Sequence, residues 1–170
     1  MRFPRFGVAI GVAALSLAVI ASPVAARQPG STIVETAMAV NAQTGEFDEL
    51  IAAAKKAGLV DVLSGNRQFT VFAPTDAAFA DLYEALGVGG VDQIDDDLLR
   101  AVLLHHVAHG ERFSGTVLAS TRVRTLNRDF LTPSVKNGSP YIDGAKILMP
   151  DVDASNGVIH VIDKVLVPGS

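Results

Sequence analysis

The sequence predicts one α+β domain, with helices in the first half of the chain and short β-strands in the second. Three observations support this prediction. Apolar residues recur at helical spacing over much of the chain up to about residue 105. Past Gly110, short runs rich in Val, Ile, Leu and Thr are separated by the turn-forming pairs Asn137-Gly138, Asp143-Gly144 and Asn156-Gly157. Between the two halves, residues 69–79 combine a buried strand with the start of a helix.

The segment 69–79 is the part around which the other elements are expected to pack. Aromatic and β-branched residues from 69 to 73 predict a strand buried on both faces. Pro74 has no N–H to donate and ends the strand. Thr75 is a good N-cap, and Asp76 places a negative charge in the first helical turn. The helix that follows carries apolar residues at i, i+3, i+4 and i+7, namely Phe79, Leu82, Tyr83 and Leu86.

Four further helical segments are expected, at about 32–40, 47–57, 59–63 and 95–105. The first begins with the Thr32-x-x-Glu35 spacing of a capping box and is followed by a turn at 41–45. The last begins with three aspartates, Asp95 to Asp97, which suit a negatively charged first turn better than a calcium site. In the second half, residues 157–168 are apolar at nearly every position, which predicts a central strand covered on both faces.

The N-terminal residues 1–26 have the features of a secretory signal peptide. Basic Arg2 and Arg5 precede an apolar run at 7–21, and small residues allow cleavage before Arg27. A retained membrane anchor is the alternative, but this run is shorter than the roughly 20 residues that span a bilayer. We therefore expect a flexible lead-in at 27–31 and a folded domain at 32–168. The product is expected to be secreted or periplasmic, without stable membrane insertion.

The composition excludes several classes of function. The formal net charge is −4, with no basic cluster, so a nucleic-acid partner is not expected. The absence of cysteine excludes disulfides, thiolate metal ligands and cysteine catalysis. No serine lies in a Gly-x-Ser-x-Gly elbow, and no glycine-rich loop has phosphate-binding spacing. The sequence thus predicts a protein that is not an enzyme and needs no cofactor. We also expect a monomer.

Three histidines form the most suggestive cluster. On one continuous helix, His105 and His109 would share a face and could hold a zinc ion, as a metal-dependent hydrolase requires. Val107 and Gly110 favour a change from helix to strand near His105, which would separate the pair by about 13 Å. His106 continues the apolar stripe of the helix, so its ring should lie in the core. A buried imidazole needs hydrogen-bond partners, and the polar groups of Thr75 and Asp76 are the expected ones.

Three segments resemble the signature boxes of the fasciclin domain family. Residues 70–79 are similar to the first box, residues 103–107 to the central tyrosine–histidine box, and residues 154–168 to the second box. The resemblance extends from about Thr32 to Pro168. It implies a wedge of about seven short β-strands with a packed group of helices. It also implies an extracellular adhesion or interaction module whose partner is a cell-surface or matrix protein or glycan, and it implies a core role for His106.

The chain departs from the family pattern at two places. His105 stands where the family usually has tyrosine. The Asp-Ile pair credited with integrin binding in animal relatives falls on Asp151-Val152, and Asp153 follows where the family has an apolar residue. Asp151, Val152 and Asp153, expected at a turn, are the candidate partner-binding residues. An alternative function is a carrier of a small apolar ligand, held in a crevice between helices and strands.

Overall fold

The computed structural model describes residues 30–169 and confirms the α+β class. Its helices are α1 (Ile33–Thr44), α2 (Asp48–Lys56), α3 (Val60–Leu63), α4 (Asp76–Leu86), the 3-10 helix η1 (Val91–Gln93), α5 (Asp96–His105) and α6 (Ser114–Ala119). Its strands are β1 (Phe69–Pro74), β2 (Val107–His109), β3 (Val123–Arg124), β4 (Phe130–Leu131), β5 (Pro133–Lys136), β6 (Ser139–Ile142), β7 (Ala145–Ala154) and β8 (Gly157–Ile162). The helical half therefore precedes most of the strands, as predicted.

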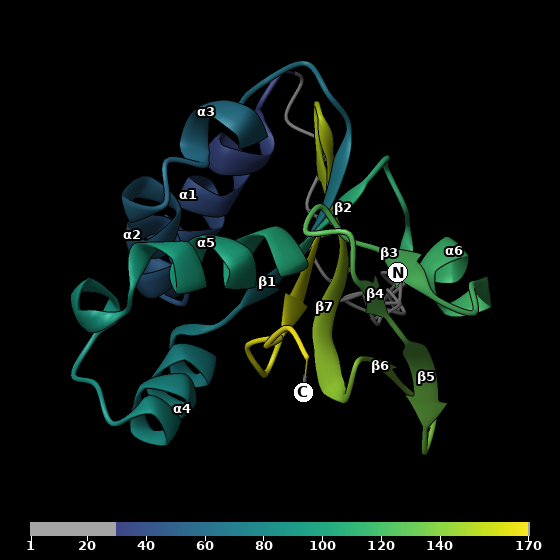
Figure 1. The fold of residues 1–170 in the computed structure, drawn as a ribbon. Helices are drawn as coiled ribbons and strands as arrows, with labels where there is room; N and C mark the ends of the chain where they lie inside the picture. The colour runs from purple at the N-terminus through teal and green to yellow at the C-terminus, as the bar shows by residue number, and fades with distance from the viewer. Residues whose placement is uncertain (1–29, 170) are drawn as a thin grey trace, which may run out of the picture.

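Six strands form one sheet in the order β2-β1-β8-β7-β6-β5, and β3 pairs with β4 (Figure 1). β1 and β8 run parallel, with Phe69 opposite Gly157 and Pro74 opposite Ile162, whereas the other neighbours are antiparallel. Every residue of β1 and β8 is buried. The two apolar runs of the sequence are thus adjacent interior strands of the sheet, which explains why neither alternates between polar and apolar residues.

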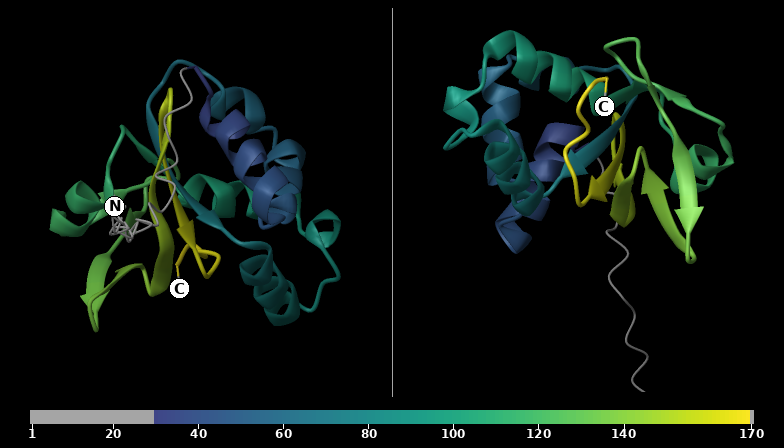
Figure 2. Two further views of the ribbon diagram at one scale, coloured as in Figure 1. Left: turned by 180° about the vertical axis from the view of Figure 1, so that it is seen from behind. Right: turned by 60° about the horizontal axis from the view of Figure 1, so that its bottom comes forward.

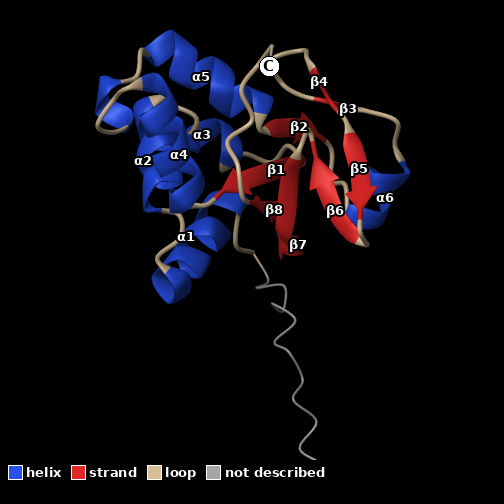
Figure 3. Ribbon diagram, turned by 90° about the horizontal axis from the view of Figure 1, so that it is seen from below, coloured by secondary structure: helices blue, strands red, loops and turns tan. Residues whose placement is uncertain are grey.

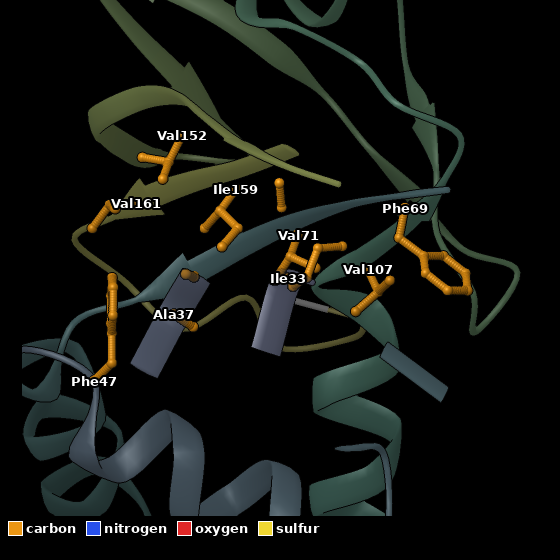
Figure 4. Packing of buried hydrophobic residues seen from close by; sticks show 11 residues of the cluster. Ile33, Ala37, Phe47, Phe69, Val71, Val107, Val152, Ile159 and Val161 are labelled. Carbon is orange, nitrogen blue, oxygen red and sulfur yellow. The ribbon is translucent and has the colours of Figure 1, made fainter. Parts of the chain in front are cut away.

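The helices α1 to α5 gather on one side of β1 and β8, while α6 lies beside β5 at the opposite end (Figures 2 and 3). The first core cluster joins the helical layer to the sheet. In it, Ile33 and Ala37 of α1 pack against Val71 of β1 and Ile159 of β8 (Figure 4). A second cluster is formed by buried residues of β6, β7 and α6 together with residues of β3 and β4, and a third holds α2, α4 and α5 together. The wedge is therefore built on β1 and β8.

The start of β8 requires glycine. Gly157 has a φ of +151°, and a Cβ at this position would lie 1.9 Å from the backbone oxygen of Phe69. The pair Asn156-Gly157 thus provides the tight turn from β7 and also permits β8 to approach β1 closely. The Asn156 side chain supports the turn, because its amide donates to the carbonyls of Leu63 and Gly65, at 2.7 and 2.8 Å.

Four expectations are corrected by the structure. The first helix continues to Thr44 instead of ending near Val40, because the left-handed Gly45 is its C-cap. Helix α6 occupies residues expected to be part of a strand meander. The last strand ends at Ile162, where the chain turns back toward α5. Asp151 and Asp153 do not flank a turn; they lie inside β7, at and beyond an irregularity in its pairing with β8.

Candidate functional site

His106 lies at the C-terminal end of α5 and is 1% exposed. Its Nδ1 lies 2.8 Å from the carbonyl oxygen of Val102, and its Nε2 accepts the N–H of Leu166 at 2.8 Å. Because Nε2 is the acceptor, Nδ1 carries the proton and the ring is neutral. Burial lowers the pKa of His106 to about 4. Its backbone oxygen also accepts the N–H of Phe72 in β1 at 2.8 Å.

The expected partners of this ring, Thr75 and Asp76, have other roles. The Thr75 hydroxyl accepts the N–H of Ala78 at 3.4 Å and caps α4. The Asp76 carboxylate accepts the N–H groups of Asp48 and Glu49, at 3.3 and 3.0 Å. It thereby supplies the cap that α2 lacks, since no side chain of its own N-cap residue does so. The prediction that His106 bonds to this corner is wrong. The C-terminal segment folds back toward α5, and the N–H of Leu166 bonds to the ring instead.

His105 and His109 do not lie in a common environment. His105 is buried at the end of α5, and its Nδ1 lies 3.0 Å from the side-chain amide of Asn127. His109 ends β2, is exposed and stacks beside Phe69 at 6.1 Å between ring centroids. Across residues 30–169, no group of three or more His, Cys, Asp and Glu side chains is arranged to hold a metal ion. The hydrolase hypothesis therefore finds no ligand set in this part of the chain.

Asp151 is bonded into the fold. Its backbone has a φ of +61° at the β7 irregularity. The carboxylate accepts the N–H of Ser114 at 2.6 Å and its hydroxyl at 2.5 Å, which caps α6. Its own N–H donates to Nδ1 of His160 at 3.1 Å, and Nε2 of His160 donates to the carbonyl of Arg112 at 2.9 Å. Burial lowers the pKa of His160, so this ring is neutral as well.

The other two candidate residues differ in position. Val152 is buried at 3% exposure in the first core cluster, and Asp153 is half-buried. Sequence reasoning missed the exposed apolar residues beside them. Leu148 and Met149 precede Asp151, and both are exposed although they are neighbours in one strand. Consecutive strand residues normally point to opposite faces, so their joint exposure follows from the irregular pairing of β7.

A hydrophobic groove lies between α1, α2 and α3 and the sheet, and His106 is among its lining residues. Its lining is apolar apart from that histidine, which matches the crevice expected for a ligand carrier. The cavity volume is about 50 Å³. Small-molecule pockets usually measure roughly 300–1,000 Å³, so in this conformation the groove does not hold a drug-sized ligand.

No helix among residues 30–169 has the length and apolar character needed to cross a membrane. The predicted signal peptide at 1–26 and most of the lead-in at 27–31 lie outside the described residues. Their assignment remains a prediction from sequence.

The fold and the site define a class of protein: an α+β domain in which a buried histidine ties a helical layer to a parallel pair of central strands. Residues 45–168 match the family model described as the fasciclin domain. The chain belongs to the fasciclin domain family, as its three sequence segments indicated.

Relatives of this chain come from bacteria and animals. Protein sll1483 of Synechocystis is 42% identical over 148 residues, covering 85% of this chain and 77% of that protein. The transforming growth factor-beta-induced protein ig-h3 of Sus scrofa is 34% identical, but the match covers only 19% of its length against 78% of this chain. The FAS1 domain pair of fasciclin I, an insect cell adhesion molecule, superposes with a TM-score of 0.66 at 19% identity. That match covers 81% of this chain and 51% of the other, and it shows the shared fold.

Proposed function

We propose that this protein is an exported, non-enzymatic interaction module that binds a protein or glycan at the cell surface. The observation that carries the proposal is that polar side chains able to take part in chemistry form hydrogen bonds inside the domain instead. His106, His160 and Asp151 are all bonded to groups of the same domain. Membership of a family that includes an insect cell adhesion molecule supports the same conclusion.

The contact surface proposed here is the region where β7 meets the start of α6. Phe113 is exposed and immediately precedes Ser114, which is bonded to Asp151. Leu148 and Met149 approach the same aspartate along β7, and both are exposed. Exposed apolar side chains fixed on a rigid frame lose little conformational freedom on binding. In this proposal Asp151 positions the surface, and Asp153 borders it.

A binding assay with surface variants tests this proposal. Purified protein is immobilised and incubated with intact cells, with cell-envelope protein and with a glycan array, beside an unrelated acidic control protein. We expect retention on one of these, and loss of most of it in the variant Phe113→Ser/Met149→Ser. Val62→Ser on α3 removes a similarly exposed apolar side chain elsewhere and should bind normally. Equal retention by both variants, or no retention above the acidic control, contradicts the proposal.

The groove beneath α1 supports a second candidate, a carrier of a small apolar ligand. Its apolar lining is the observation in favour, and its volume of about 50 Å³ requires α1 to move outward before a ligand can enter. Native mass spectrometry of freshly purified protein tests this candidate. A co-purified lipid would support it, whereas a mass equal to that of the polypeptide alone argues against it.

A further inference from the structure

A second apolar groove lies between α4 and α5, the two helices that η1 connects in the chain. Leu82, Ala85 and Leu86 line it from α4, and Leu98, Leu99 and Val102 line it from α5. Its volume is about 170 Å³. An apolar cavity of roughly 150 Å³ is large enough to hold benzene, so this groove has room for one large aliphatic or aromatic side chain.

The groove opens to solvent. Leu86 is 45% exposed and Leu98 is 42% exposed, and each belongs to the lining. Surface leucines are common singly, but here two of them form opposite walls of one concave site. An apolar side chain that enters between them would be removed from water, together with both leucines, which favours association.

The segment that forms most of this groove is strongly negative. Residues 76–99 contain no Lys, Arg or His and seven carboxylates: Asp76, Asp81, Glu84, Asp92, Asp95, Asp96 and Asp97. This segment therefore carries a formal charge of −7, whereas the whole chain carries −4, so the remaining residues are net positive. The negative charge of the protein is concentrated on the two helices that form the groove and on their connection.

Part of this charge has a structural role and part has none. Asp76 caps α2, Asp95 caps α5, and Asp96 pairs with Lys56 at 3.3 Å. The exposed carboxylates of Asp81 and Glu84 have no such role. Asp81 lies one turn before Ala85 on the same face of α4, so it borders the groove.

Lys56 and Arg100 lie in the helical layer but do not neutralise the carboxylates of Asp81 and Glu84. The Lys56 ammonium also bonds to the carbonyl of Ile94 at 2.7 Å, and Arg100 bonds to the carbonyl of Ala57. The Lys56 side chain therefore points toward η1, and the Arg100 side chain points toward the end of α2.

We propose that this groove docks an amphipathic, cationic segment of a partner protein, with one large apolar side chain in the groove and Lys or Arg over the acidic border. Charge complementarity selects this occupant. An anionic lipid surface or an acidic peptide would be repelled by the same carboxylates. A second copy of this chain would bring its own acidic segment to the contact. The inference concerns a surface distinct from the β7–α6 surface of the proposed function, and either can fail without the other.

The probe is a fluorescently labelled helical peptide of about 15 residues, with Leu at i, i+3, i+4 and i+7 and Lys elsewhere; a matched peptide carries Glu in place of Lys. Fluorescence anisotropy measures binding to the full chain. We expect the Lys peptide to bind, the Glu peptide not to bind, and the affinity to fall between about 50 and 500 mM NaCl. Leu86→Ser/Leu98→Ser should weaken binding at least about tenfold, and Asp81→Asn/Glu84→Gln should weaken it and flatten the salt dependence.

The matched control is Val62→Ser/Val135→Ser, which removes two exposed apolar side chains from α3 and β5 and should leave binding unchanged. Circular dichroism shows whether each variant is folded. The proposal is overturned if the wild-type protein does not bind the Lys peptide, if the groove variant binds it as well as the control does, or if the Glu peptide binds equally. Sedimentation without peptide adds a further test: a dimer that disappears in the groove variant would make a second copy the occupant and would also overturn the proposal.

Discussion

Replacing His106 with Gln should make the stability of this protein less sensitive to pH. In the unfolded chain a histidine has a pKa of about 6.5, whereas burial lowers the pKa of His106 in the folded protein to about 4. Below about pH 6.5 the unfolded state therefore binds a proton that the folded state rejects, so stability falls as the pH is lowered toward 4. Well above pH 6.5 the ring is neutral in both states and contributes no pH dependence.

The magnitude follows from these two pKa values. Between pH 7 and pH 5 the folded protein should lose about 2 kcal/mol of unfolding free energy through His106 alone. His160, whose pKa burial also lowers, acts in the same direction. The wild-type protein should therefore become clearly less stable at pH 5.

The assay is urea unfolding at pH 7, 6 and 5 and constant ionic strength. Gln at position 106 keeps a side-chain acceptor for the N–H of Leu166 but does not titrate. His106→Gln should lower stability at pH 7 by roughly 1–3 kcal/mol, through the altered hydrogen bonds, and reduce the pH 7-to-5 loss by about 2 kcal/mol. The exposed His109→Gln serves as the control and should keep the wild-type slope. An unchanged slope in His106→Gln would refute the argument that burial holds this ring neutral.

Two further substitutions test the frame around the site. Gly157→Ala should destabilise the protein by more than about 4 kcal/mol, because the new Cβ would meet the Phe69 oxygen. Gly138→Ala is the control and should cost about 1 kcal/mol, since a Cβ there would meet no other atom. Similar denaturation midpoints for the two variants would contradict this prediction. Asp76→Ala should cost about 1–2 kcal/mol by uncapping α2, whereas the exposed Asp81→Ala should stay within about 0.5 kcal/mol in the same measurement.

The elements predicted best from sequence are those whose signals are local. In the segment 69–79, the strand, the proline and the N-cap follow one another within a few residues, and the structure confirms each of them. The capping box at Thr32 and the aspartate cap of α5 are also formed as expected. Such signals depend on backbone hydrogen bonds within one turn, so the rest of the fold does not alter them.

The elements that were missed depend on distant residues. Helix α6 has no side-chain cap of its own, and the carboxylate that caps it comes from Asp151, 37 residues away. The second partner of the His106 ring, Leu166, is 60 residues away. Nothing near Ser114 or His106 in the sequence indicates these contacts. Sequence reasoning could place a buried imidazole in the core, but it could not say which backbone group would reach it.

His106 gives a physical reason why the segments that resemble the three family boxes occur together. Its ring bonds to Leu166 in the last segment, and its carbonyl oxygen bonds to Phe72 in the first. One residue of the middle segment thus joins the helical layer to β1 and to the chain that follows β8. Loss of any of these contacts would leave a polar group buried without a partner, at a cost of about 1–3 kcal/mol.

The same reasoning decides which side chains can meet a partner. If Asp151 were to bind another molecule through its carboxylate, it would first have to release the N–H and the hydroxyl of Ser114. Each lost hydrogen bond to a charged group costs about 1.5–3 kcal/mol, and the partner would have to replace both before gaining affinity. Met149 and Phe113, by contrast, are exposed and give up only contact with water. Recognition at the β7–α6 surface should therefore depend on these apolar side chains, with Asp151 holding them in place.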